Sequence, residues 1–139
     1  MAPWADALYA MDRAWWDRYM AEVLTEFQGE RVSQLDKLRH AIHVKMPAYG
    51  NSGAAAIALA AKWGARRVIM LGYDCAKTDG KPHWHGDHPA GLGNAGSMPK
   101  WPRQFQKLAD DLRNVEIINC SRQTALGMFP RRSLEEVLL

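Results

Sequence analysis

The chain has 139 residues, which suits one globular domain with room for a hydrophobic core. Hydrophobic residues make up 47% and charged residues 24% of the sequence, and these values exclude disordered and fibrous classes. The formal net charge of +3 comes from scattered basic residues, which argues against a nucleic-acid-binding protein. Since no secretory leader is evident and no apolar run reaches the ~18–20 residues of a membrane helix, we expect a soluble cytoplasmic protein without a membrane partner.

The first third of the chain predicts a strand, a helix and two further strands. Residues 7–12 are predicted to form a short buried strand. Over residues 13–27 apolar side chains recur at intervals of three and four, which predicts an amphipathic helix that ends at Gly29. Residues 31–34 and 41–46 have the composition of short strands.

The clearest pattern is a Gly-rich turn followed by an Ala-rich helix and an apolar strand. The helix is predicted over residues 54–63, with Asn51 or Ser52 as its N-terminal cap and Gly64 at its end. Residues 67–72 are predicted to be a buried strand. This order is typical of a parallel βαβ unit, and a strand that is apolar on both faces is expected at the centre of its sheet.

The last part of the chain predicts a loop, a helix, a strand and a short closing helix. Residues 76–100 form a long loop rich in Gly, Pro and His, and such a loop in a compact domain is usually functional or disordered. An amphipathic helix follows over residues 101–112, and a strand over residues 115–120. Ser133 and Glu136 have the spacing of a capping box, which predicts a helix in the C-terminal tail.

This alternation predicts a single α/β domain over residues 1–139. We expect a three-layer Rossmann-like sandwich with a mainly parallel central sheet. Open sheets of this kind bind ligands outside the carboxyl ends of their strands, which here precede Met46–Gly53, Gly72–His88 and Cys120–Thr124. The function is therefore expected to be centred on two loops at these ends, Gly50–Gly53 and Gly72–His88.

The turn of Gly50, Asn51, Ser52 and Gly53 has two interpretations. Backbone N–H groups of residues 52–54 and the positive end of the helix dipole suit a phosphate, which predicts an anion or nucleotide site. A capped turn that needs glycine for its backbone angles accounts for the same residues without a ligand.

Two further groups of polar residues follow predicted strands. Gly72, Tyr73 and Asp74 close the strand before the long loop, where an Asp either binds a sugar hydroxyl or a metal, or forms a turn. Cys75 and Cys120 are expected to be free thiols that serve as small buried residues, and a structural role for Cys120 is favoured over that of a nucleophile.

The densest cluster of reactive side chains is His83, His85, Asp87 and His88 in the long loop. It holds three of the five histidines of the chain. Histidine transfers protons near neutral pH and is also the commonest transition-metal ligand. A divalent metal held by the three histidines is one hypothesis, but ordering one flexible loop around a metal costs backbone entropy, so a metal-free general base is favoured.

From about Tyr49 onward, the order of these features resembles the second half of the bacterial CMP-sialic-acid-dependent sialyltransferases and their uncharacterised relatives encoded in phages and prophages. In this family the Ser-Gly turn contacts the nucleotide donor and a loop histidine deprotonates the acceptor hydroxyl. The resemblance therefore implies that Ser52 and Gly53 contact a CMP-linked or other nucleotide-sugar, that His88 is the general base, and that no cofactor is required. The residues that carry it are, in chain order, Asn51-Ser52-Gly53, Val68-Ile69-Met70-Leu71-Gly72-Tyr73-Asp74, the His83–His88 loop, helix 101–112, strand 115–120, Ala125-Leu126 and Phe129-Pro130.

The family opens with a nucleotide-binding strand and turn that have no counterpart here, so a shortened version of the family fold is expected. The leading interpretation is a phage-type sialyltransferase-like domain that binds a nucleotide or nucleotide-sugar, either with transfer through His88 or without transferase activity. One alternative is a metal-dependent hydrolase that uses the His83–His88 loop, and another is a non-catalytic phage accessory binding protein. A homo-oligomer or a partner chain that completes the site is expected, in the host cytoplasm if the chain is phage-encoded.

Overall fold

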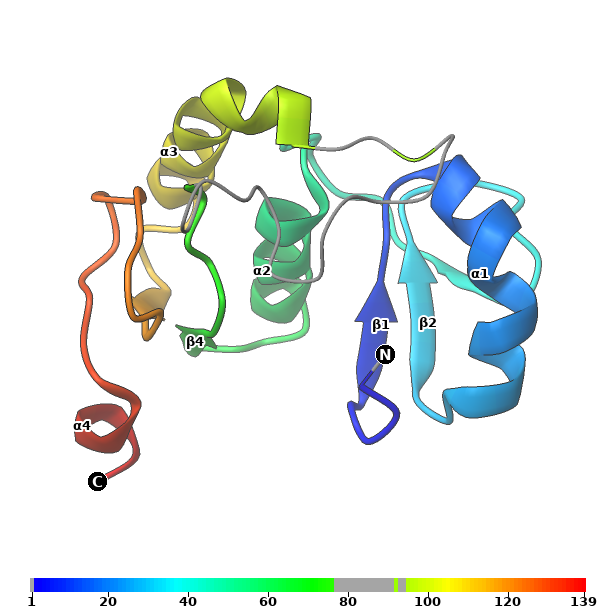
Figure 1. Cartoon of the computed structure of the whole chain (residues 1–139), viewed down its shortest axis with the longest axis horizontal. Coiled ribbons are helices and arrows are strands. Elements are labelled where there is room, and N and C mark those ends of the chain that lie inside the picture. The colour runs from blue at the N-terminus through cyan, green and yellow to red at the C-terminus, as the bar shows by residue number, and fades with distance from the viewer. Residues whose placement is uncertain (1, 77–91, 93–94) are drawn as a thin grey trace. The chain divides into compact units, whose positions relative to one another are not determined.

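The computed structural model describes residues 2–76, 92 and 95–139, and it shows a mixed α/β structure with two short parallel sheets (Figure 1). The chain divides into two compact units, Met1–Ala48 and Tyr49–Leu139, and each unit contains one of the sheets. Among the described residues, every helix is too short or too polar to span a bilayer.

The first unit is a three-stranded parallel sheet accompanied by one long helix. Its elements are β1 (Ala7–Tyr9), α1 (Arg13–Glu26), β2 (Glu30–Ser33) and β3 (Ile42–His43). The strands pair in the order β1-β2-β3, with Leu8 opposite Arg31 and Val32 opposite Ile42. The three strands and the helix predicted for this part of the chain are thus confirmed, with β1 and β3 shorter than expected.

The core of the first unit is formed by one face of α1. Trp16, Val23 and Phe27 are separated by seven and four residues, so they point to the same side of the helix, and all three are buried. The indole N–H of Trp16 donates to the carbonyl oxygen of Ala10 at 3.0 Å, so the polar end of this fully buried side chain is satisfied. The apolar spacing in the sequence therefore predicted this packing face.

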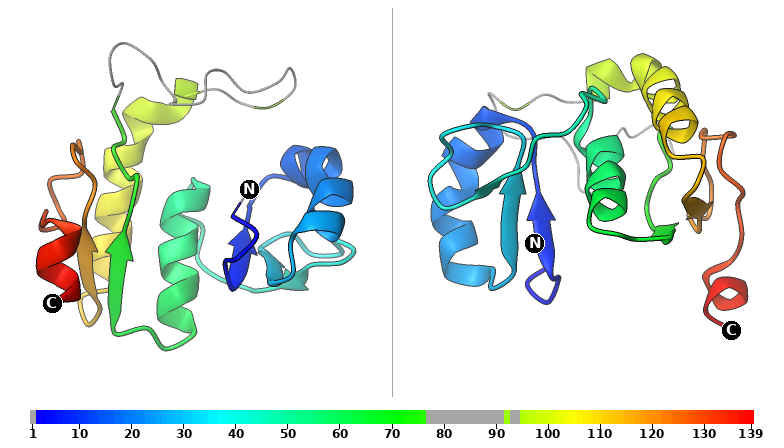
Figure 2. Two further views of the ribbon diagram at one scale, coloured as in Figure 1. Left: turned by 60° about the horizontal axis from the view of Figure 1, so that its bottom comes forward. Right: turned by 180° about the vertical axis from the view of Figure 1, so that it is seen from behind.

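In its described residues, the second unit contains a two-stranded parallel sheet and three α-helices. Its elements are α2 (Ser52–Lys62), β4 (Arg67–Met70), the 3₁₀ helix η1 (Ala95–Lys100), α3 (Trp101–Asp111), β5 (Glu116–Asn119) and α4 (Leu134–Leu138). β4 and β5 lie side by side (Figure 2), in register from Arg67 opposite Glu116 to Met70 opposite Asn119. Arg131 adds an isolated parallel bridge beside Asn119.

Local sequence signals fix the ends of two helices in this unit. The side chain of Asn51 accepts a hydrogen bond from the backbone N–H of Ala54 at 2.8 Å, so Asn51 is the cap of α2. Gly64 follows the helix with a positive φ of 97°, the usual glycine conformation at a helix end. Ser133 and Glu136 form the predicted capping box of α4.

Two expectations for this unit need correction. The end of the predicted loop is helical: η1 contains Pro99 and runs directly into α3. Pro102 is tolerated in the first turn of α3, where no intrahelical N–H bond is needed. β4 was predicted to be central, yet within the described part of this unit it is hydrogen-bonded to a strand on one side only. It also ends at Met70, because the chain turns at Gly72 with a φ of 74° and leaves Leu71 60% exposed.

Candidate functional site

The two predicted turns meet through the side chain of Tyr73. Its hydroxyl donates to the carbonyl oxygen of Gly53 at 3.2 Å. A Cβ atom on Gly53 would lie 3.1 Å from the Tyr73 ring, so the absence of a side chain at this position permits the contact. Burial, with a smaller contribution from Cys75, raises the pKa of Tyr73 to about 12, so the hydroxyl keeps its proton at neutral pH.

The turn before α2 is held by α3. The side-chain N–H of Asn51 donates to the Gln104 side-chain oxygen at 2.8 Å, so both ends of the Asn51 amide have partners within the protein. Gly50 has a φ of 81°, and a side chain there would collide with Gln104. The requirement for glycine and asparagine in this turn is therefore explained by its structure, without reference to a ligand.

The Ala54 N–H, predicted as an anion donor, is engaged by the helix cap in this structure. That N–H already donates to the Asn51 side chain at 2.8 Å, because the same helix end that attracts an anion also accepts a capping side chain. An anion at this edge of the sheet must therefore find donors other than the Ala54 N–H.

A buried polar network at the end of β5 fixes the backbone of Tyr73. Asn119 is fully buried; its amide donates to the Tyr73 carbonyl at 3.2 Å and accepts from the Ser121 N–H at 3.0 Å. The Thr124 hydroxyl also donates to the Tyr73 carbonyl, at 2.7 Å, and the Tyr73 N–H donates to the Ser121 hydroxyl at 2.7 Å. The residues after β5 thus hold both backbone polar groups of Tyr73.

The residues after β5 also hold the backbone of Asp74. The N–H of Ala125 donates to the Asp74 carbonyl oxygen at 2.8 Å. The Asp74 carboxylate is partly buried and has no hydrogen bond or ion pair with any residue that the structure describes. It therefore presents an acceptor whose backbone is held in place at the carboxyl end of β4.

The cysteines are less buried than the sequence predicts. Cys75 and Cys120 are both free and only partly buried; Cys120 directly follows β5, and Cys75 lies five residues beyond the end of β4. Burial, together with the nearby Asp74, raises the pKa of the Cys75 thiol to about 11, so this thiol is protonated at neutral pH and is a weak nucleophile. The Cys120 thiol lies 3.8 Å from the Ser133 carbonyl oxygen.

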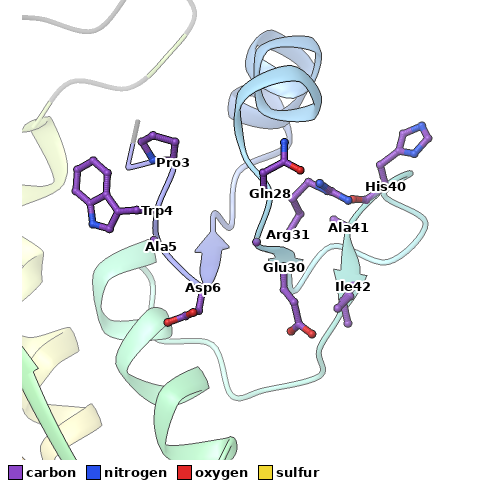
Figure 3. A pocket seen from close by; sticks show the side chains of 11 residues that line it. Pro3, Trp4, Ala5, Asp6, Gln28, Glu30, Arg31, His40, Ala41 and Ile42 are labelled. Carbon is purple, nitrogen blue, oxygen red and sulfur yellow. The ribbon is translucent and has the colours of Figure 1, made fainter.

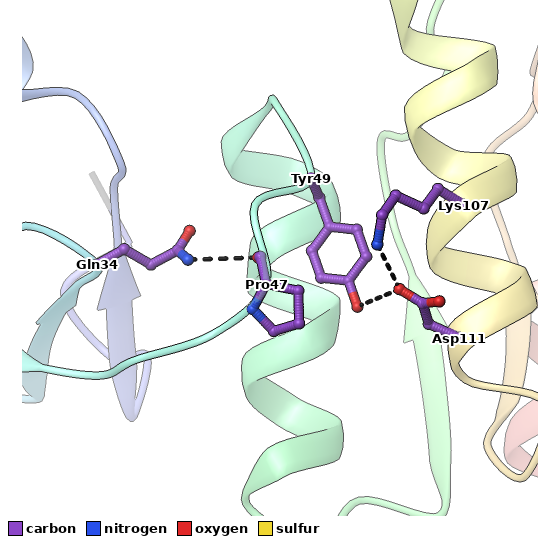
Figure 4. A network of polar contacts seen from close by, with 5 residues as sticks. All are labelled: Gln34, Pro47, Tyr49, Lys107 and Asp111. Carbon is purple, nitrogen blue, oxygen red and sulfur yellow. Dashed lines mark hydrogen bonds and ion pairs between the residues drawn. The ribbon is translucent and has the colours of Figure 1, made fainter.

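Tyr49 ties the start of the α2 turn to the other end of α3 (Figure 4). It is only 4% exposed, and its hydroxyl donates to Asp111 at 3.1 Å. Lys107 lies 2.6 Å from the same carboxylate oxygen and 4.7 Å from the centre of the Tyr49 ring. Burial and Asp111 raise the pKa of Tyr49 to about 12, whereas the hydrogen bonds from Lys107 and then Tyr49 lower the pKa of Asp111.

The first unit has an open hollow of about 810 Å³ (Figure 3). Residues just before each strand line it, among them Asp6 before β1 and Ala41 before β3, together with Trp4, whose side chain is 83% exposed. The hollow therefore lies at the amino ends of the parallel strands, whereas sheets of this class bind ligands at the carboxyl ends. It contains none of the residues predicted to form a site.

The predicted catalytic residues His85, Asp87 and His88, and His83 of the alternative metal site, lie outside the described residues. The part of the chain that the structure describes contains no group of three or more His, Cys, Asp or Glu side chains arranged to hold a metal ion. Comparison of the chain with known proteins gave no match to a family model, to a curated protein or to a solved structure. The geometry of the described residues is thus the basis for a functional proposal.

Proposed function

We propose that the second unit binds a nucleotide or nucleotide-sugar at the carboxyl ends of β4 and β5, beside the turn that begins α2. The observation that carries this proposal is the contact between Tyr73 and Gly53. It joins a turn whose composition suits a phosphate to the turn of Asp74, whose carboxylate has no hydrogen-bond or ion-pair partner among the described residues. Nucleotides bind at the corresponding edge of other open parallel sheets.

Each part of the proposed site has a chemical role. The Asp74 carboxylate accepts hydrogen bonds from sugar hydroxyls, and the N-terminal end of α2 adds a partial positive charge near the phosphate. The resemblance of this part of the sequence to sialyltransferases favours a cytidine nucleotide. Where sugar transfer occurs, His88 is the general base, so His88→Ala would abolish transfer and leave nucleotide binding intact.

The three-layer arrangement of the fold is part of the same proposal. We propose that the chain adopts a Rossmann-like sandwich of three layers, since every strand pairing in the described residues is parallel. An experimental structure tests this. A mainly parallel sheet with helices on both faces supports the proposal, whereas helices on one face only contradict it.

Calorimetric titration with CMP tests the binding site. We expect CMP to bind and Asp74→Asn to weaken its affinity by about 10-fold or more, because hydrogen bonds to a charged acceptor contribute about 1.5–3 kcal/mol. Gly53→Val should abolish binding, because its side chain displaces Tyr73. Gly127→Val is the matched control, since no atom lies within 4 Å of a Cβ there. Absence of CMP binding at millimolar concentration, or equal affinity in all variants, would contradict the proposal.

A further inference from the structure

We infer that Arg122 and Arg131, at the carboxyl end of β5, bind the phosphate of the nucleotide. This inference rests on the proposed function and assigns the anion-binding part of that site. No motif in the sequence marks these two arginines, because they are nine residues apart. They are brought together because Arg131 pairs with Asn119 at the end of β5.

The backbone places the two arginines beside each other. Arg131 forms the parallel bridge with Asn119, the last residue of β5, and the Asn119 N–H donates to the Pro130 carbonyl at 2.9 Å. The guanidinium of Arg131 donates to the carbonyl oxygen of Arg122 at 2.7 Å. Both residues therefore lie at the same edge of the sheet as Asp74, where the neighbouring strand β4 ends.

The positive charge at this edge has no acidic partner among the described residues. An arginine has five N–H donors, and the hydrogen bond from Arg131 to a neutral carbonyl leaves both charge and donors for an anion. The carboxylate of Glu136, in the same tail, instead accepts from the Ser133 N–H at 3.0 Å. At the opposite end of the sheet the arrangement differs, since Arg67 pairs with Glu116 across β4 and β5.

The hydrogen-bond network around Asn119 connects the residues that carry the two arginines with the turn that carries Asp74. Arg122 directly follows Ser121, whose N–H and hydroxyl both bond within the network. The same network holds Tyr73, which precedes Asp74. One buried cluster thus fixes the backbones that carry the two arginines and the carboxylate, so a phosphate and a sugar hydroxyl are recognised at one edge.

Titrations of CMP and of cytidine against wild type and variants test this inference. We expect Arg122→Gln and Arg131→Gln each to weaken CMP binding by about 10-fold and the double variant by about 100-fold, because charge-assisted hydrogen bonds to phosphate are lost. Cytidine, which has no phosphate, should bind all variants equally. Arg66→Gln is the matched control, since it removes the same charge from an exposed position at the amino end of β4.

The outcomes separate this inference from the proposed function. If wild type binds CMP and the arginine variants bind it equally well, the inference is wrong and the proposed site stands. The inference is also wrong if Arg66→Gln weakens CMP binding as much as the Arg122 and Arg131 variants do, because the effect is then one of net charge. If wild type binds neither CMP nor cytidine, the proposed function and the inference both fail.

Discussion

Replacement of Gly29 by alanine is expected to destabilise the protein by about 3 kcal/mol or more, because the new side chain overpacks a rigid site. A Cβ atom at this position would collide with the carbonyl oxygen of Asp6 and lie 2.5 Å from that of Ala5 and 2.7 Å from the Phe27 ring. Two of these three neighbours are backbone atoms, which cannot move aside without disturbing the entry to β1.

Thermal unfolding measures this effect directly. For a chain of this length the expected loss corresponds to a fall in Tm of about 10 °C. Gly127→Ala is the control, since its Cβ meets no atom within 4 Å and its φ is not positive. A Tm for Gly29→Ala within a degree or two of the control would show that the turn between α1 and β2 is looser than described.

Asn119→Ala is expected to lower the free energy of unfolding by about 2–3 kcal/mol, because it leaves the buried N–H of Ser121 without an acceptor. The matched control is Asn114→Ala, which removes the same side chain from an exposed position. Denaturant unfolding gives the stability, and hydrogen exchange should show faster exchange at the Tyr73 and Ala125 amides. Equal stability of the two variants would contradict a supporting role for the network.

The sequence predicted those elements whose signals are local. The apolar spacing of residues 13–27 and the cap at Asn51 both depend on residues within a few positions of each other, and both are confirmed. The capping box of α4 is confirmed for the same reason. The helical start at Ala95–Lys100 was missed because its Gly and Pro residues are also typical of loops.

The candidate site could be predicted only in part. The rule that ligands bind at the carboxyl ends of parallel strands directed attention to Gly53 and Tyr73, which the structure places in contact. The partners of Tyr73 could not be predicted, because Asn119 and Thr124 are 46 and 51 residues away along the chain. Their only sequence signal is that polar residues directly follow an apolar strand.

The central claim is tested most directly by following the backbone amide resonances of the labelled protein during a titration with CMP. We predict that the resonances that shift belong to the turn at residues 52–53, the turn at residues 73–74 and the segment at residues 121–122, with saturation at a single affinity. Residues that line the hollow of the first unit, such as Trp4, should not shift. Absence of shifts at millimolar CMP, or shifts confined to that hollow, would contradict a nucleotide site at the ends of β4 and β5.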